Sequence, residues 1–186
     1  MKIGIAGGIG SGKSYLSRIL EQKGYQVYDC DAAAKRLIRT EPEIRKQLTD
    51  LIGPRTYRED GELNKALVSQ FLLASERNAK AINAIVHPYV FRDFEASGLE
   101  WMESGIMFES GINTLVDKTI AVIAPKDVRI QRVMERDRIS KEKVLEWMDR
   151  QMPQRDVIKK SDFVVINDGQ MDIERQLIKI IDQCNK

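Results

Sequence analysis

A run of eight residues near the start of the chain, GGIGSGKS from Gly7 to Ser14, has the residue types that bind a triphosphate. It matches in full the pattern G-x-x-x-x-G-K-[ST] of a phosphate-binding loop. Glycines let backbone N–H groups approach phosphate oxygens, because no Cβ stands in the way. Lys13 adds a mobile positive charge, and the hydroxyl of Ser14 suits Mg²⁺. The motif predicts a nucleotide-binding loop that consists of Gly8, Ile9, Gly10, Ser11, Gly12, Lys13, Ser14 and Tyr15.

The surrounding residues favour this interpretation over a glycine-rich turn that matches by accident. Ile3 and Ile5 indicate a short strand before the loop, and residues 15–23 indicate a helix after it. A helix that begins near Gly12 would direct the positive end of its dipole toward the phosphates. The sequence therefore places the loop between a strand end and a helix start.

Short apolar segments alternate with helical patterns along the chain, which predicts an α/β fold with a parallel sheet. Their Ile and Val content and their turn-rich flanks favour strands that are buried on both faces. The expected strands are residues 2–6, 26–28, 105–108, 119–123 and 163–166.

Two helical regions separate these strands. The first, about residues 32–97, has the size of an acceptor-binding region, although extra helical packing would give the same pattern. The second, about residues 127–160, is the expected lid. Residues 126–160 hold eleven Lys and Arg against seven Asp and Glu, so a phosphate clamp is expected there.

Composition restricts the class of protein further. The 186 residues suit one globular domain, and a net charge of +2 is too small to indicate a nucleic-acid partner. No apolar run reaches the roughly 18 residues of a membrane span, and the chain enters a strand directly, so neither a membrane partner nor a signal peptide is expected. Cys30 and Cys184 lack metal or disulfide spacing. We expect a cytoplasmic monomer or weak homo-oligomer.

Two large classes of nucleotide-binding protein lack their further motifs in this chain. A GTPase would carry N/T-K-x-D, but the segment NKAL that begins at Asn64 lacks the aspartate. A motor ATPase would show an apolar strand that ends in Asp-Glu, whereas the expected third strand runs into Phe108-Glu109. A short chain with a helical insert and an Arg-rich lid suits a small-molecule kinase better.

Further short motifs follow the phosphate-binding loop in a specific order. They are Asp29-Cys30-Asp31, Asp60-Gly61-Glu62-Leu63, His87-Pro88, Met107-Phe108-Glu109-Ser110, Arg132, Arg136-Asp137, Gln151-Met152-Pro153, Ser161-Asp162 and Asn167-Asp168-Gly169. Each motif is weak alone, but together they closely resemble the dephospho-CoA kinase family from Lys2 to about Gly169.

The resemblance implies a P-loop kinase fold with a five-stranded parallel sheet core, a helical acceptor-binding insert and a helical lid, in a single domain of residues 1–186. It implies transfer of the γ-phosphate of ATP, with Mg²⁺, to the 3′-hydroxyl of 3′-dephospho-CoA, the final step of CoA biosynthesis. The alternatives are another P-loop nucleotide or metabolite kinase, or a non-catalytic ATP-binding switch.

The resemblance also implies roles for individual residues. The expected catalytic residues are Asp31, Lys13 and Arg136; the expected acceptor contacts are Asp29, Asp31, Lys65, His87 and Glu109; Arg150 and Asn167 join the nucleotide site, and Ser14 the metal site. Three positions depart from the usual pattern of the family. Lys65 and Trp147 stand where Arg is common, and Gly105 stands where Pro is frequent.

Asp29 and Asp31 follow the second expected strand, at the edge where parallel sheets bind ligands. In a strand-like conformation, residues two apart project to the same side, so both carboxylates would face one ligand. The resemblance makes Asp31 the partner of the acceptor hydroxyl. The alternative for either residue is a helix N-cap, for which Asp is well suited.

The other candidates have structural alternatives as well. His87 suits a helix terminus or an acceptor contact, and Glu109 suits a Mg²⁺ contact through water, an acceptor contact or a structural strand end. Arg136 lies on one helical face with Arg132, and such a face usually meets solvent. The alternative is that Arg136, together with Arg150 or Arg155, closes over the triphosphate. Asn167 lies in a simple turn that the resemblance puts against adenine.

Overall fold

The computed structural model describes residues 1–184, which divide into two compact units. The sheet unit comprises Met1–Asp29 and the chain from Leu99 onward, and the helical unit comprises Cys30–Gly98. Within the described residues, no helix is both long and apolar enough to span a membrane.

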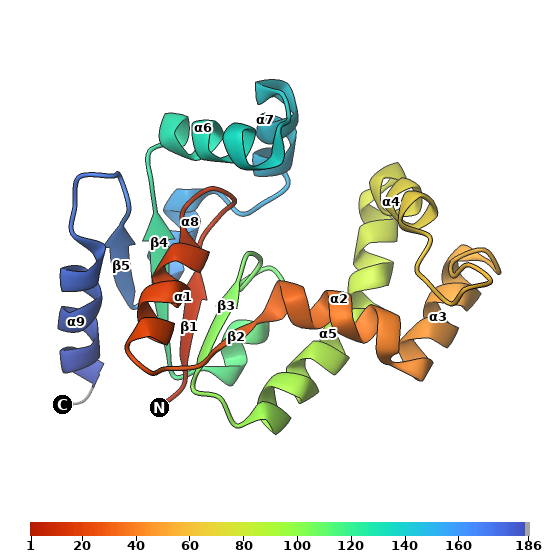
Figure 1. The fold of residues 1–186 in the computed structure, drawn as a ribbon, viewed down its shortest axis with the longest axis horizontal. Coiled ribbons are helices and arrows are strands. Elements are labelled where there is room, and N and C mark those ends of the chain that lie inside the picture. The colour runs from red at the N-terminus through yellow and green to blue at the C-terminus, as the bar shows by residue number, and fades with distance from the viewer. Residues whose placement is uncertain (185–186) are drawn as a thin grey trace. The chain divides into compact units, whose positions relative to one another are not determined.

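The sheet unit contains a parallel sheet of five strands within residues 1–184, in the order β2-β3-β1-β4-β5. Its strands are β1 (Ile3–Ala6), β2 (Val27–Asp29), β3 (Trp101–Ser104), β4 (Lys118–Ile123) and β5 (Phe163–Ile166). Figure 1 shows that the turn from β1 into α1 lies at the same end of the sheet as the exit from β4 toward α6. The predicted parallel α/β fold is confirmed.

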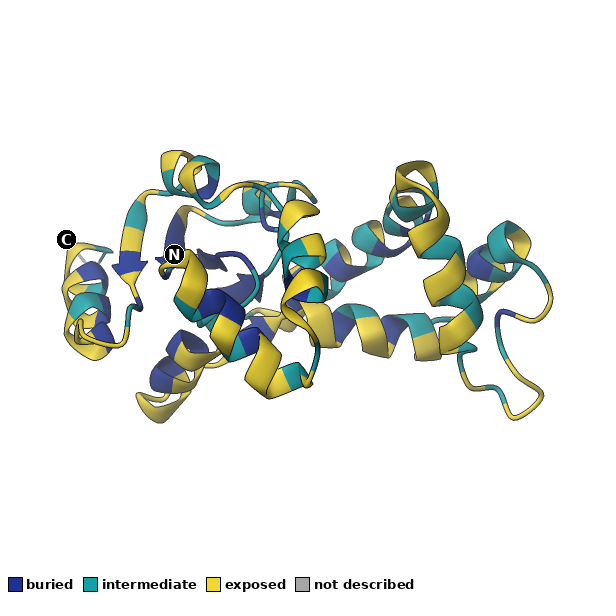
Figure 2. Ribbon diagram, turned by 90° about the horizontal axis from the view of Figure 1, so that it is seen from above, coloured by how far each residue is buried: buried dark blue, intermediate teal, exposed yellow. Residues whose placement is uncertain are grey.

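Helices follow the strands of this unit along the chain. They are α1 (Lys13–Gln22), the 3₁₀ helix η1 (Ile112–Leu115), α6 (Lys126–Asp137), α7 (Lys141–Asp149), α8 (Gln154–Lys160) and α9 (Ile173–Cys184). Apolar residues of α1 and α9, such as Leu16, Leu20 and Leu177, pack with Ile5 and Val122 of the sheet in one core. Figure 2 shows helices that alternate between buried and exposed positions, the pattern of amphipathic helices on a sheet. The central strands β1 and β3 are buried throughout, whereas the edge strands β2 and β5 have exposed positions, so the predicted burial on both faces is wrong for the two edges.

The helical unit contains α2 (Cys30–Thr40), α3 (Pro42–Ile52), α4 (Lys65–Ala74) and α5 (Glu76–Ser97). Side chains cap two of these helices: Asn64 accepts from the amide of Leu67, and Ser75 accepts from the amide of Asn78. Both are residue types that favour the N-cap position. The region that the sequence predicts to be helical is helical here.

The prediction of a strand at residues 105–108 is wrong. The third strand is β3, which ends at Ser104, and residues 105–108 form turns. The sequence misleads because Glu103 and Ser104 interrupt the apolar pattern of β3 although both are buried. The apolar segment after them follows its own packing, since Met107 fills the space beside Gly4.

Candidate active site

The phosphate-binding loop is the sharp turn between β1 and α1 (Figure 1). Gly7, Gly10 and Gly12 have φ angles of +153°, +77° and +97°, in the region that favours glycine. A Cβ on Gly7 would lie 2.5 Å from the carbonyl oxygen of Val122. Gly12 is the N-cap of α1, and no side chain caps that helix. No side chain therefore competes with a ligand for the positive end of α1.

The hydroxyl of Ser11 shows that the loop is shaped for a further polar partner. Among residues 1–184, Ser11 Oγ is the one buried side-chain nitrogen or oxygen with no hydrogen-bond partner. Such an orphan is costly in a folded protein unless a ligand or water satisfies it. Together with the start of α1, it fits an anion with several acceptor oxygens.

Glu103 lies beside the loop and is the functional candidate that sequence reasoning missed. The hydroxyl of Ser14 donates to Glu103 Oε1 at 2.8 Å, and the hydroxyl of Ser17 donates to Glu103 Oε2. Glu103 is paired in register with Ile5 of β1 and Asp29 of β2. A signal existed, because a carboxylate near the carboxyl end of a parallel strand lies where such sheets bind ligands, but the wrong bounds of the third strand favoured Glu109 instead.

Glu109 has a different contact. Its Oε1 accepts from the backbone N–H of Met152 at 2.8 Å, so Glu109 anchors the segment between α7 and α8. A direct role with acceptor or metal stays a prediction for Glu109.

Asn167 contacts the loop from the end of β5. It is buried, and its Nδ2 donates to the carbonyl oxygen of Ser11 at 2.9 Å. Arg132 of α6 donates to the backbone oxygen and to Oδ1 of Asn167, both at 3.1 Å. This short chain of bonds joins α6 to the loop, and the proposed adenine contact of Asn167 stays a prediction.

The other basic candidates of the lid region form exposed ion pairs with nearby acids. Arg136 donates from Nε and Nη2 to both carboxylate oxygens of Asp137, at 2.8 and 2.7 Å. This pairing raises the pKa of Arg136 and lowers that of Asp137. Arg150 donates to Glu146 at 2.7 Å, and Arg155 Nε lies 3.6 Å from Asp156. Exposed ion pairs of this kind are weak, so each arginine can exchange its carboxylate partner for a phosphate.

The carboxylates of Asp29 and Asp31 are both exposed, but the predicted local geometry is wrong. β2 ends at Asp29, and Asp31 already lies in the first turn of α2, which begins at Cys30. The two residues are therefore not successive positions of one strand. Asp31 is also inside the helix and not at its N-cap, although a negative charge is favourable in a first turn.

Two more candidates lie in the helical unit. His87 is inside α5, so the helix-terminus alternative is wrong. Its ring stacks on Phe91 with centroids 6.2 Å apart. Burial lowers the pKa of His87, so the ring is neutral at pH 7 and offers a hydrogen bond rather than a charge. Lys65 is exposed and begins α4.

A family model supplies the decisive comparison. The model described as dephospho-CoA kinase matches residues 1–172, a span that includes the phosphate-binding loop, Glu103, Asn167 and the whole helical unit. The chain belongs to the dephospho-CoA kinase family. It is an ATP-dependent phosphotransferase with dephospho-CoA kinase activity, which is the final step of CoA biosynthesis.

Individual relatives agree with this result. A dephospho-CoA kinase of Bacteroides fragilis (strain YCH46) is 39% identical over 188 residues, which cover 97% of this chain and 91% of that protein. The crystal structure of TT1252 from Thermus thermophilus has a TM-score of 0.85 at 32% identity and covers 98% and 96% of the two chains. A dephospho-CoA kinase from Campylobacter jejuni, at 20% identity and a TM-score of 0.67 over 99% and 98% of the chains, supports the fold alone. The predicted P-loop kinase fold is confirmed.

The role that the family motifs imply for Arg136 has a direct test. We expect Arg136→Ala to lower kcat on the order of 10²-fold if Arg136 acts as the predicted clamp, because a bidentate donor to the charge on the transferred phosphoryl group would then be lost. Arg136→Lys should restore activity only in part, since the charge survives and the fork does not. Steady-state kinetics with ATP and dephospho-CoA measure both.

Asp137→Asn is the matched control, because it breaks the same ion pair from the other side. We expect it to leave kcat near the wild-type value. If the variants at both positions lose activity equally, the Arg136–Asp137 ion pair is what activity requires, and Arg136 does not clamp the phosphates. If none of them loses activity, the clamp passes to Arg150 or Arg155.

Proposed function

We propose that this dephospho-CoA kinase works with Lys13 and Arg136 on the phosphates of ATP and with Asp31 on the 3′-hydroxyl of the acceptor. The observation that supports this proposal best is the span of the family match, which includes the phosphate-binding loop of the sheet unit and the helical unit that carries Asp31. Because phosphoryl transfer has a loose transition state, positioning and charge stabilisation are the main tasks of these residues.

The residues beside the loop fit a magnesium ion. Mg²⁺ prefers oxygen ligands and is held by one or two protein groups together with substrate phosphates. The hydroxyl of Ser14 and the carboxylate of Glu103, already 2.8 Å apart, offer such ligands, directly or through water. When bound with ATP, the ion neutralises charge on the phosphates.

A charge-removing change at Glu103 tests this metal site. We expect Glu103→Gln to raise the Mg²⁺ concentration needed for half-maximal activity about 10–100-fold, the usual effect of losing a supporting group of a metal site. Activity measured against Mg²⁺ at saturating ATP gives this value. Glu174→Gln is the matched control, because it removes an exposed carboxylate of α9 that pairs with Lys23 and has no part in the proposed site. An unchanged Mg²⁺ requirement in Glu103→Gln would assign Glu103 to packing alone.

The acceptor side of the proposal is supported by the family motifs. We propose that Asp31 accepts the proton of the 3′-hydroxyl and that Asp29, Lys65, His87 and Glu109 help to hold the acceptor. Lys65 would contribute a point charge where a guanidinium would give a fork. On the nucleotide side, Arg150 and Asn167 complete the proposed contacts of the loop residues from Gly8 to Tyr15.

The working state of the protein is a further part of the proposal. We infer a single functional kinase domain of residues 1–186, active as a monomer or weak homo-oligomer and without a nucleic-acid or membrane partner. Neither Cys30 nor Cys184 is in a disulfide, which is compatible with the reducing cytoplasm, where we place the enzyme.

A panel of acceptors tests the proposed substrate. The protein is incubated with MgATP and dephospho-CoA, AMP, adenosine or no acceptor, and ADP release is followed with time. We expect ADP release to depend on dephospho-CoA alone. Equal release with AMP would favour another nucleotide kinase, and release that needs no acceptor would favour an ATP-hydrolysing switch.

A further inference from the structure

The peptide groups of Ile9, at the outer bend of the phosphate-binding loop, are held by two side chains from distant parts of the chain. Ile9 N–H donates to Oε1 of Gln151 at 2.7 Å, and the carbonyl oxygen of Ile9 accepts from Nε of Arg129 at 2.9 Å. Arg129 comes from α6 and Gln151 from the segment between α7 and α8. Both backbone groups of one residue are thus fixed by side chains.

Peptide planarity carries this restraint to the neighbouring residues. In a trans peptide, the C=O of one residue and the N–H of the next point in opposite directions, and the structure has no cis peptide among its described residues. Because Arg129 holds the Ile9 carbonyl on one side, the N–H of Gly10 must point to the other. Within residues 1–184 the structure gives Gly10 N–H no acceptor.

The same reasoning applies to the preceding peptide. With Ile9 N–H turned toward Gln151, the carbonyl of Gly8 points the opposite way, where it accepts from Ser11 N–H at 3.2 Å. That bond closes the turn that contains the buried hydroxyl of Ser11. Gln151 therefore fixes the orientation of the Gly8–Ile9 peptide in the turn, and Arg129 fixes the direction of the Gly10 N–H.

The glycines beside Ile9 make room for this arrangement. A Cβ on Gly8 would collide with Nη2 of Arg129 and lie 3.3 Å from Oε1 of Gln151. A Cβ on Gly10 would lie 2.5 Å from the carbonyl oxygen of Arg129. The lack of a side chain at Gly8 and Gly10 thus allows α6 to pack close to the loop, and it also leaves space for a phosphate.

Each of the two side chains is itself anchored. Gln151 Nε2 donates to the carbonyl oxygen of Gly105 at 3.3 Å, just after β3. Arg129 is buried and donates from Nη1 to Oε1 of Gln154 at 3.4 Å, which also accepts from Ala124 N–H. The loop is therefore tied to the ends of β3 and β4 through these side chains.

We propose that Arg129 and Gln151 are positioning residues of phosphoryl transfer, which hold the Ile9 peptides so that the N–H of Gly10 faces the triphosphate. They touch neither substrate in this account and act only through the loop. The inference rests on the proposed binding of ATP at the loop.

The test separates nucleotide binding from acceptor binding. Gln151→Met keeps the size of the side chain but removes the acceptor for Ile9 N–H. We expect the Kd for ADP, measured by calorimetry, and the KM for ATP to rise about tenfold, the size expected when a hydrogen bond is lost and a polar group is left unpaired. The KM for dephospho-CoA and the Tm should stay near the wild-type values.

Conservative variants sharpen the result. Gln151→Glu keeps an acceptor oxygen for Ile9 N–H but loses the N–H that bonds Gly105, so we expect it to bind ADP more tightly than Gln151→Met and more weakly than the wild type. Arg129→Lys keeps the charge but loses the fork that reaches both Ile9 and Gln154, so it should weaken ADP binding as Gln151→Met does. If Arg129→Lys fails to fold, the two variants at Gln151 still decide the matter.

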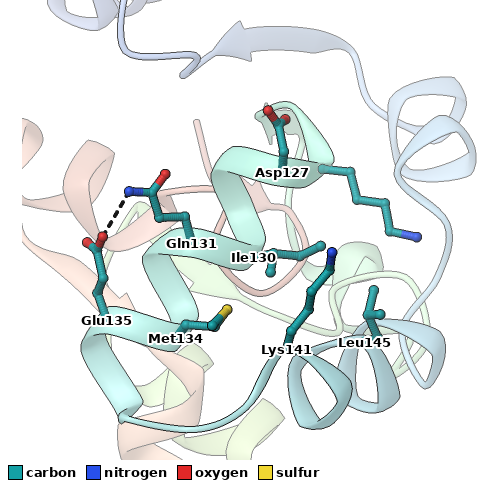
Figure 3. A pocket seen from close by; sticks show the side chains of 8 residues that line it. Asp127, Ile130, Gln131, Met134, Glu135, Lys141 and Leu145 are labelled. Carbon is teal, nitrogen blue, oxygen red and sulfur yellow. Dashed lines mark hydrogen bonds between the residues drawn. The ribbon is translucent and has the colours of Figure 1, made fainter.

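Gln131→Met is the matched control. Gln131 belongs to α6 and bonds Glu135 at 2.9 Å, and both line a hollow together with further residues of α6 and α7 (Figure 3). We expect it to leave ADP affinity unchanged. An unchanged Kd for ADP in Gln151→Met would overturn the proposal. Equal rises in both KM values with a lowered Tm would also overturn it, because that pattern indicates general loosening of the fold. The ADP titration needs no acceptor, so its outcome is independent of the assigned substrate.

Discussion

Replacing Lys13 by alanine should lower kcat about 10²–10³-fold, the loss typical of removing one preorganised charge that stabilises a transition state. Lys13 is the first residue of α1 and follows the N-cap Gly12, so we expect its ammonium and the positive end of the helix to act on the same phosphates. Charge on the β- and γ-phosphates is redistributed only during transfer. The KM for ATP should therefore change less than kcat.

Lys179→Ala is the matched control for Lys13→Ala, because it removes one exposed ammonium from α9 of the same unit. Steady-state kinetics and a thermal melt of both variants separate catalysis from stability. We expect normal kcat for Lys179→Ala and a normal melting temperature for both. A near-normal kcat in Lys13→Ala would mean that the loop holds an anion other than the reacting triphosphate.

Asp31→Asn should lower kcat about 10²–10⁴-fold, the range of general-base assistance, with little change in ATP affinity. A secondary ribose hydroxyl is a poor nucleophile at neutral pH, and a carboxylate can both accept its proton and orient its oxygen. Asparagine keeps the size and hydrogen bonding of the side chain but not its charge. Asp29→Asn should cost less, because Asp29 is expected only to contact the acceptor.

Asp50→Asn is the control for Asp31→Asn, because it removes an exposed negative charge from α3 of the same unit. Its kcat should equal that of the wild type. Asp31 also stabilises α2 as a first-turn carboxylate. If Asp31→Asn lowers the Tm while most of the activity remains, that helical role is the whole role and the catalytic assignment is wrong.

Local patterns in the sequence suffice for the loop and for most of the sheet. The loop motif is contiguous, and the strand at Phe163–Ile166 has the predicted bounds. The prediction of β3 fails because its polar residues are buried, and their hydrogen bonds form only in the folded protein. Glu103 accepts hydrogen bonds from the hydroxyls of Ser14 and Ser17 of α1. A local pattern of apolar residues cannot reveal a carboxylate whose hydrogen-bond partners lie 89 and 86 positions away in the chain.

The surroundings of the loop depend on still longer separations. Arg129 and Gln151 reach Ile9 across 120 and 142 positions, and Asn167 reaches Ser11 across 156. The sequence marks the residue types, since Gln151 and Asn167 both belong to recognised motifs, but not the atoms that they contact. The start of α2 was missed for a local reason, because Cys30 and Asp31 fit an extended strand end as well as a first helical turn.

The position of the new phosphate tests the central claim most directly. The wild-type protein is incubated with MgATP and 3′-dephospho-CoA, and the product is examined by phosphorus NMR with coupling to the ribose protons. We predict one new phosphomonoester on the 3′-oxygen, formed in step with ADP. A phosphate at another position, or inorganic phosphate as the sole product, would contradict it.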